Sequence, residues 1–479
     1  MKNKIKHMNR KLTIYLFSTL AIMFALSSNY IEAQSQPETK KQIKYKKARA
    51  LQTSTAKKMA KVYEALEEVD DKGEPAPDME TVLEVLTDLR NNKDNLKSYD
   101  RSVMWNAWAY VYMNDGKYPE AMDAYTKLMN EPEVTIGLRN GAMFALAQLN
   151  LAQENYKKGI QLILQWMDEV EKVTAQSYSV LGQAYYATKD YRKSMKSLET
   201  AIDMAEEEGY KPRENWYALL AACYSELKDE IGEKESILKQ IPIYEILVNL
   251  YPKKLYFIQL GGAYGTLGRE RDYMITMKTA YQKDFLNKEG EYLALAQLLL
   301  LNKNPYWAAE VLVSGQKKMI TITDEETKEE KIVPVVKSTE KNLKVLADAW
   351  RMAQEIDKAI PVLEKAAAMS KDGKSYVLLG NLYLSEDKVN EAVAAIKKGL
   401  EKGKITKLSQ VYLTLGQAYF ELEEFDEAKK NFRIAARDKD KKIKTQANNW
   451  IKYTENEEIR VANLALRRDF IQMNSSSSS

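Results

Sequence analysis

The sequence contains one histidine and one cysteine, and these two scarcities exclude most nucleophilic and metal chemistry. The histidine, His7, lies in an N-terminal segment that we expect to be removed on secretion. Its loss excludes a Ser-His-Asp triad, a Cys-His pair and a histidine-ligated zinc or haem site. Cys223 has no second cysteine for an internal disulfide or a cysteine-rich metal site. We therefore expect no catalytic residues, no cofactor and no metal, and we classify the chain as non-enzymatic.

Glycine and proline are also scarce, at 19 and 11 of 479 residues, whereas tyrosine is abundant at 30. A collagen-like chain, a flexible linker and a turn-rich β-sandwich all need more glycine and proline than this. Hydrophobic residues make up 45% of the chain and charged residues 29%, which is too apolar for a disordered protein. The composition therefore predicts a folded and mainly helical protein.

Segment 1–33 has the pattern of a secretory signal. A cationic stretch, MKNKIKHMNRK, precedes the apolar run LTIYLFSTLAIMFAL, which is short for a transmembrane helix. We expect cleavage before Gln34, with retention as an inner-membrane anchor as the alternative. The segment holds five of the 72 basic residues and one of the 68 acidic residues, so the rest of the chain has 67 of each sign. This balance argues against binding to nucleic acid or to an anionic membrane.

Similar strings recur along the rest of the chain. Three of them are WNAWAYVYMNDGKYPEAMDAY from Trp105, YSVLGQAYYATKDYRKSMKSL from Tyr178 and YLTLGQAYFELEEFDEAKKNF from Tyr412. Each has a large residue, Leu or Trp three residues later, Gly or Ala directly after that, and Tyr three residues further on, before a polar turn. The pattern resembles the tetratricopeptide repeat (TPR). This resemblance implies an all-α fold, a right-handed superhelical solenoid of helix-turn-helix repeats.

Nine repeats can be placed by their first large residue. These residues are Trp105, Met143, Tyr178, Tyr217, Phe257, Tyr292, Leu343, Tyr376 and Tyr412. Most of the intervals between them are near the period of about 34 residues that is typical of this repeat. A degenerate helix pair is expected before them, over 48–69 and 78–90.

Small residues mark the places where the two helices of a repeat are expected to cross. On the first helices they are Gly182, Gly261, Gly380 and Gly416, and on the second helices they are Ala121, Ala308, Ala359, Ala392 and Ala428. The string GGAYGTLG from Gly261 therefore predicts helix packing and not a phosphate-binding loop. Tyr273 places a bulky residue where a small one is expected, so we predict that its repeat is splayed or shifted in register.

The sequence predicts seven segments. They are a signal peptide at 1–33, a degenerate helix pair at 34–100, six repeats at 101–318, an insertion at 319–339, three repeats at 340–440, capping helices at 441–473 and a disordered serine tail at 474–479. The insertion contains two β-branched runs around an acidic turn, which fit a β-hairpin near 319–338 and an ordered loop equally well. Capping helices are expected because the last repeat otherwise exposes its apolar stacking face.

A binding groove is the expected functional site, because the first helix of each TPR lines the concave face of the solenoid. The candidate groove residues are Asn106, Tyr110, Phe144, Gln148, Gln183, Tyr186, Gln297, Asn381, Gln417 and Phe420. Five of them are amides placed five residues after the first large residue of a repeat. A side-chain amide both donates and accepts hydrogen bonds, so a row of amides suits the backbone of an extended peptide. A hydrated groove wall without a ligand is the alternative.

Four further strings carry a closer resemblance. They are ENWYALLAACYSELKD, NLYPKKLYFIQLGGAYGTLGRERD, AQLLLLNKNPYWAAEVL and NNWIKY, and they resemble periplasmic TPR proteins that accompany TonB-ExbB-ExbD energy-transduction systems in marine gammaproteobacteria. The resemblance spans most of residues 48–455. It implies a periplasmic interaction subunit, monomeric or part of a complex, with TonB, ExbB or ExbD as partners in uptake. A general envelope scaffold, for outer-membrane protein assembly, polysaccharide export or peptidoglycan-linked complexes, is the alternative.

Overall fold

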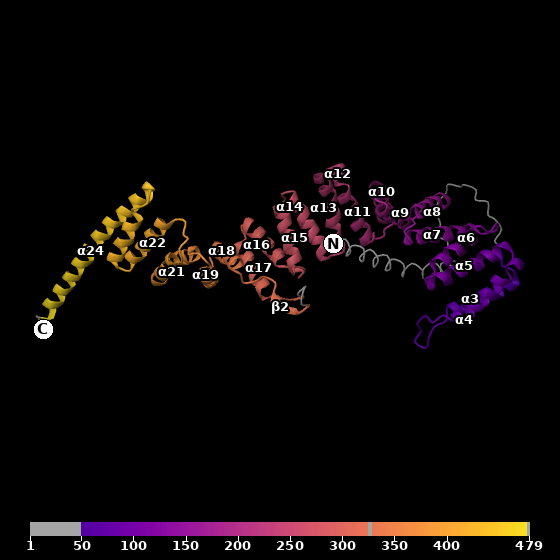
Figure 1. Ribbon diagram of the computed structural model, residues 1–479, viewed down its shortest axis with the longest axis horizontal. Coiled ribbons are helices and arrows are strands. Elements are labelled where there is room, and N and C mark those ends of the chain that lie inside the picture. The colour runs from indigo at the N-terminus through magenta and orange to yellow at the C-terminus, as the bar shows by residue number, and fades with distance from the viewer. Residues whose placement is uncertain (1–48, 324–327, 477–479) are drawn as a thin grey trace. The chain divides into compact units, whose positions relative to one another are not determined.

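The computed structural model describes residues 49–323 and 328–476. The described chain is almost entirely helical and forms two compact units, which comprise residues 49–247 and 248–476. Figure 1 shows the helices of each unit as successive helical hairpins. The predicted all-α solenoid fold is confirmed. The predicted signal peptide and residues 34–48 lie outside the described residues.

Five helix pairs are present among the described residues of the first unit. Their bounds are α3 (Thr53–Leu66) with α4 (Met79–Asn91), α5 (Ser98–Asn114) with α6 (Tyr118–Met129), α7 (Ile136–Ala152) with α8 (Tyr156–Glu169), α9 (Ala175–Ala187) with α10 (Tyr191–Glu207), and α11 (Glu214–Glu226) with α13 (Glu233–Leu250). A short 3-10 helix, η1 (Lys93–Asn95), and one helical turn, α12 (Lys228–Ile231), lie between them. The helix α13 spans the boundary between the two units. From α3 to α11, each α-helix contacts the next one.

The second unit continues the same arrangement and adds a hairpin. The bounds are α14 (Lys254–Thr266) with α15 (Glu270–Gln282), α16 (Glu289–Leu301) with α17 (Pro305–Lys317), strands β1 (Met319–Thr323) and β2 (Glu330–Pro334), α18 (Glu340–Met352) with α19 (Ile356–Met369), α20 (Lys374–Leu384) with α21 (Val389–Lys402), α22 (Leu408–Glu421) with α23 (Phe425–Ala435), and α24 (Lys441–Ser476). Each helix from α14 to α24 contacts the next. All nine residues that located the repeats in the sequence lie on the first helix of a pair.

Glycine allows the two helices of a pair to approach closely. A Cβ atom added to Gly182 would lie 2.8 Å from the Cγ of Leu198, and one added to Gly416 would lie 2.6 Å from the ring of Phe432. Both distances are shorter than a carbon–carbon contact allows, so a side chain at either position would force the helices apart. The five alanines predicted at the crossing points of the second helices are fully buried. The prediction of close helix crossings is confirmed.

Tyr273 is accommodated by a second glycine. Its ring lies on α14, where added Cβ atoms would be 3.0 Å from it at Gly261 and 3.1 Å from it at Gly265. These two glycines are one helical turn apart, so together they leave a flat surface for the aromatic ring. The tyrosine therefore fits because α14 lacks two side chains at this point, and the predicted splay or shift in register stays a prediction.

Eight of the ten first helices in the described chain, all except α3 and α11, end in a tight turn that reverses the chain. Two of these turns use glycine at positive φ, Gly116 and Gly268. Six others place a residue with a side chain there, with φ between 56° and 64°: Glu154, Lys189, Lys303, Gln354, Asp387 and Glu423. The next amide donates to a carbonyl five residues earlier, as Glu355 does to Trp350 at 3.0 Å. This is the hydrogen bond of a Schellman motif, which closes the helix and turns the chain back.

Of the two alternatives for the insertion, a hairpin and an ordered loop, the structure has the hairpin, and the C-terminal helix is longer than predicted. The strands β1 and β2 pair in antiparallel fashion with Thr321 opposite Ile332, while Ile320 packs against the core of the second unit. The helix α24 is continuous for 36 residues and includes residues 474–476, which were predicted to belong to a disordered tail. Its buried residues Ala447 and Thr454 face the last pair. Within residues 49–323 and 328–476, no helix combines the length and apolarity needed to cross a membrane.

Candidate functional site

The first helices of successive pairs lie beside one another. Helix α5 contacts α7, and α9 contacts α11, although a second helix separates each of these pairs in sequence. The same holds for α20 and α22 in the second unit. We call the solvent-facing side of these helices the first-helix surface: it comprises α5, α7, α9 and α11 in the first unit, and α14, α16, α18, α20 and α22 in the second.

Six of the predicted groove residues are amides, and all six reach solvent. Asn106, Gln148 and Gln183 lie on α5, α7 and α9, and each is half-buried. In the second unit, Gln297 on α16 and Asn381 on α20 are exposed, whereas Gln417 on α22 is half-buried. None of the six side chains forms a hydrogen bond with another described residue. Their donors and acceptors are therefore available to a ligand. Three of these amides lie in the first unit and three in the second.

Two predicted groove residues have other roles. Phe144 is only 9% exposed, and its ring packs against Trp166 of α8 at 4.7 Å between centroids. Phe420 contacts Trp450 and Tyr453 of α24, at 5.5 Å and 5.3 Å. Phe144 therefore holds its own helix pair together, and Phe420 joins the last pair to α24. The repeat pattern gives the position of these rings on a helix but not the direction in which they turn.

The two predicted groove tyrosines are half-buried on first helices. Tyr110 lies on α5, and Tyr186 lies near the end of α9, where it meets Tyr191 edge-on at 5.3 Å. Burial, with a smaller effect from the carboxylate of Glu226, raises the pKa of Tyr186 to about 12. Its hydroxyl therefore remains protonated at neutral pH and can donate a hydrogen bond.

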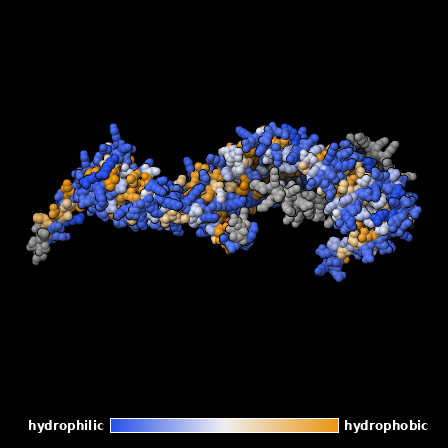
Figure 2. Space-filling model, in the orientation of Figure 1, coloured by the Kyte–Doolittle hydropathy of each residue, from blue (hydrophilic) through white to orange (hydrophobic). Residues whose placement is uncertain are grey.

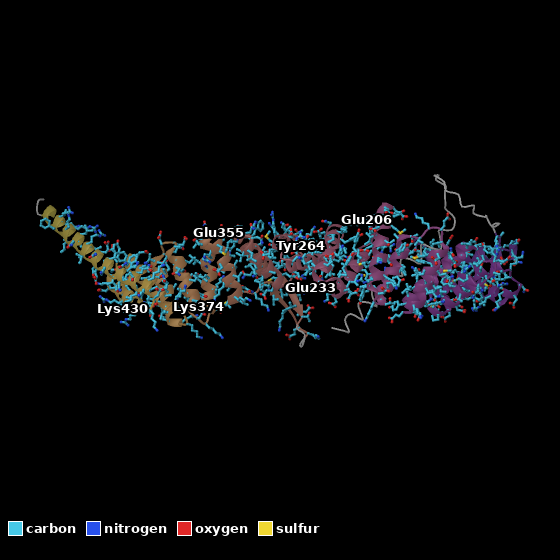
Figure 3. The ribbon with its side chains drawn as sticks, turned by 90° about the horizontal axis from the view of Figure 1, so that it is seen from above. Glu206, Glu233, Tyr264, Glu355, Lys374 and Lys430 are labelled. Atoms are coloured by element: carbon cyan, nitrogen blue, oxygen red, sulfur yellow. The ribbon has the colours of Figure 1, made fainter. Side chains whose placement is uncertain are left out.

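Sequence reasoning missed the hydrogen bonds between tyrosine and glutamate that join successive pairs. Tyr217 donates to Glu206 at 2.8 Å and Tyr224 to Glu199 at 2.6 Å, so two bonds tie α11 to α10. Glu206 is labelled in Figure 3. Burial, with this hydrogen bond as the second cause, raises the pKa of Tyr224. Finding such pairs from sequence requires the packing register of two helices, which the repeat period alone does not give.

The described residues offer no evident catalytic or metal site. Within 49–323 and 328–476, no group of three or more His, Cys, Asp and Glu side chains is placed to hold a metal ion. Cys223 is fully buried, and its thiol donates to Ser194 at 3.1 Å. Burial raises the pKa of this thiol to about 11, so it remains in the unreactive protonated form at neutral pH.

A shallow depression of about 780 Å³ lies along α24 and was not predicted. Its lining comes from one side of this helix: Lys441, Lys442, Thr445, Gln446, Asn449, Trp450 and Tyr453. Since a single helix lines it, the depression is an open surface, unlike the enclosed clefts that hold small molecules.

Comparison with known families identifies three of the helix pairs. The tetratricopeptide repeat profile matches residues 175–208, 373–401 and 409–436. These segments correspond to α9 with α10, α20 with α21, and α22 with α23. These pairs are therefore TPRs, a type of repeat that generally binds protein partners.

Solved structures with a similar arrangement have low sequence identity to this chain. A crystal structure of MamA protein is 22% identical, with 38% of this chain and 89% of that chain covered and a TM-score of 0.30. A tetratricopeptide repeat protein from Parabacteroides merdae ATCC 43184 is 15% identical, with 59% and 98% covered and a TM-score of 0.25. The APC/C hetero-tetramer Cut9-Hcn1 is 11% identical, with 84% and 96% covered and a TM-score of 0.28. Comparison with curated proteins gave no match. At these values, no function is transferred from any of these proteins.

Proposed function

We propose that this chain is a non-catalytic interaction subunit that binds extended segments of partner proteins on its first-helix surface. The observation that carries the proposal is the set of six amides on first helices, five of which lie at the same place in their repeats. All six reach solvent, and none is used in a hydrogen bond within the described chain. The TPR identity of three pairs supports a protein as the ligand.

The amides suit a peptide backbone because each one matches both an N–H and a C=O group. A hydrogen bond of this kind contributes about 0.5 to 1.5 kcal/mol net, so the three amides of one unit give only modest affinity. A partner that engages both units gains avidity, because its second contact is intramolecular. This mode of binding depends little on the partner's side chains.

We further propose that the partner belongs to a TonB-type energy-transduction system and that the chain acts in the periplasm. The support is the resemblance of four strings, among them ENWYALLAACYSELKD on α11 and the start of α12, and NNWIKY on α24. The signal-like pattern of segment 1–33 is consistent with export. TonB, ExbB and ExbD are the partners to be tested.

Co-purification with TonB, ExbB and ExbD tests the site and the partner together. The test variant replaces Gln148, Gln183, Gln297 and Gln417 by alanine. The control variant replaces Gln161 of α8 and Gln282 of α15, which are exposed glutamines on second helices. We expect the wild type and the control to recover a partner and the test variant to recover much less. Equal recovery by the wild type and both variants would place the binding surface elsewhere.

Growth of a strain that lacks this protein tests whether the protein acts in a TonB-type uptake system. We expect impaired growth on a chelated iron source and nearly normal growth on rich medium, because the energised step matters only when the substrate is scarce. Antibiotic leakage without an uptake defect would instead support a general envelope scaffold.

A further inference from the structure

The C-terminal part of α24 presents apolar side chains to solvent. Ile459, Leu466 and Phe470 are 60%, 68% and 67% exposed, and Figure 2 shows hydrophobic residues at this end of the helix. Before this part, α24 is held to α23 by an ion pair between Glu458 and Lys429 at 2.8 Å. A helix of about 15 residues is marginal in water unless an apolar face is covered. We call these exposed apolar side chains of α24 the stripe, and we expect another helix to cover them.

The spacing of the stripe is that of a short coiled coil. Ile459 and Leu466 are seven residues apart and fit the d positions of a heptad. Asn456, Asn463 and Phe470 are also seven apart and fit the a positions. Asparagine at an a position favours a two-stranded parallel pair, because two asparagines then face each other and hydrogen bond within the seam.

The charges beside the stripe select the same arrangement. Glu455 and Asp469 fall at g positions, and Arg460 and Arg467 fall at e positions. In a parallel pair each g residue faces the next e residue of the other helix, so Glu455 meets Arg460. In an antiparallel pair the arginines would face each other. Arg460 already bonds Glu457 of its own helix, but its guanidinium carries five donors and can serve both carboxylates.

The same charges argue against a lipid surface. Residues 455–472 contain three arginines, at 460, 467 and 468, against four carboxylates, at 455, 457, 458 and 469. Amphipathic helices that bind anionic membranes carry an excess of Lys and Arg on their polar face. This segment has no such excess.

The position of the stripe leaves room for a second helix. Ala447 and Thr454 mark the face of α24 that packs on the last pair. At about 100° per residue, the centre of the stripe lies roughly 150° around the helix from that face. Towards the N-terminus the same side carries Lys452, Lys442 and Lys441, whose like charges would repel those of a second copy. Pairing is therefore confined to the exposed end.

We propose that α24 forms a parallel two-stranded coiled coil with α24 of a second copy of this chain, along residues 456–470. This inference goes beyond the proposed function and does not depend on it. The sequence predicts a chain that is monomeric or part of a complex, whereas this proposal makes it a dimer.

Sedimentation equilibrium of the full chain tests the dimer over a roughly hundredfold range of concentration. The test variant is Leu466→Glu, which places a carboxylate in the seam. The matched control is Leu464→Glu, two residues away and outside the stripe. We expect a concentration-dependent dimer whose dissociation constant rises about tenfold or more in the test variant and stays unchanged in the control. Circular dichroism should show that both variants keep their helicity, because both leucines are exposed.

Cross-linking tests the orientation. In a parallel pair Asn456 faces its counterpart, so Asn456→Cys is expected to form a disulfide-linked dimer under mild oxidation, whereas Ala465→Cys, outside the stripe, is not. A monomeric wild type, an equal effect of both glutamate variants, or no preference for position 456 would each overturn the proposal. Binding of the stripe to a different protein would appear as a monomeric wild type in the purified sample.

Discussion

At the scale of single residues, small side chains set the distance between paired helices. Gly182 and Gly416 lie where any side chain would meet a neighbouring Leu or Phe, and the two glycines beside Tyr273 fit its ring. The repeat pattern predicts the first kind of glycine, because the spacing of large and small residues marks the crossing point. It predicts Gly261 as a crossing residue as well, but not that Gly261 and Gly265 together match the ring of Tyr273, because the pattern treats each position alone. A bulky residue on one helix that is matched by glycines on the other is a pairwise feature.

Two glycines provide a matched test of this account. Gly416→Ala places a methyl group 2.6 Å from Phe432 and is expected to destabilise the second unit by about 1 to 3 kcal/mol. Gly262→Ala meets no atom within 4 Å on an exposed part of α14 and is expected to stabilise by about 0.5 to 1 kcal/mol, because alanine favours a helix. Urea unfolding measures both. The same sign for both variants would contradict the packing argument.

The positive-φ turns give a second residue-scale prediction. Gln354 is exposed and has φ of 62°, a conformation that costs a residue with a side chain about 1 to 2 kcal/mol. Gln354→Gly removes this strain but adds freedom to the unfolded chain, so we expect a net gain of about 0.5 to 1 kcal/mol. Gln354→Ala keeps the strain and is the control. A thermal melt in which alanine stabilises as much as glycine would show that the turn is not the cause.

Tyrosines that are buried or half-buried make the stability of the fold depend on alkaline pH. Burial is the first cause that raises the pKa values of Tyr186, Tyr292 and Tyr383 to about 12, from an ordinary 10.0. The folded chain therefore holds these protons more tightly than the unfolded chain does. Their contribution to stability is fully present below pH 10 and is lost as the pH rises from about 10 to about 12. The urea midpoint is expected to fall over this range, and to fall less in Tyr383→Phe, which removes one titrating group. A flat profile would contradict the assignment.

At the scale of elements, the sequence predicts where the helix pairs lie but not where the C-terminal helix ends. Two β-branched runs with a polar turn between them made the hairpin of β1 and β2 one of two alternatives, but did not decide between it and an ordered loop. The full length of α24 did not, because a serine-rich end resembles a disordered tail. The roles of Phe144 and Phe420 also depend on neighbours: Trp166 on the partner helix covers one, and the aromatic side chains of α24 cover the other. The residue pattern of one helix does not show which side chains of other helices will cover these rings.

The aromatic side chains of α24 that pack on the last helix pair, α22 and α23, give a testable prediction about this element. Trp450 stacks on Phe432 at 5.6 Å and meets Phe420 at 5.5 Å. Trp450→Ala is expected to cost about 2 kcal/mol, less than for a fully buried tryptophan because this ring is half-buried. Asn449→Ala, next to it and exposed, should change stability by less than about 0.5 kcal/mol. Hydrogen exchange of α22 and α23 would locate the loss, and unchanged protection there would show that α24 does not cap the array.

At the scale of the whole molecule, the overall charge balance hides a difference between the two units. Residues 49–247 contain 24 Lys and Arg against 34 Asp and Glu, which gives a net charge of −10, whereas residues 248–476 contain 38 against 32, which gives +6. The chain after segment 1–33 is neutral overall because these two differences, together with the basic excess of residues 34–48, cancel. Complementary charge steers association, so a basic partner segment is expected to prefer the first unit and an acidic one the second.

The central claim is that partners bind on the first-helix surface, and site-specific photo-cross-linking tests it most directly. A photoreactive amino acid replaces Gln183 or Gln297 on first helices, or Gln161 or Gln282 on second helices, in cells that express the native partners. The four positions share one residue type and reach solvent. The account predicts a cross-linked partner from positions 183 and 297 and none from 161 and 282. Cross-links from the second-helix positions alone would contradict it.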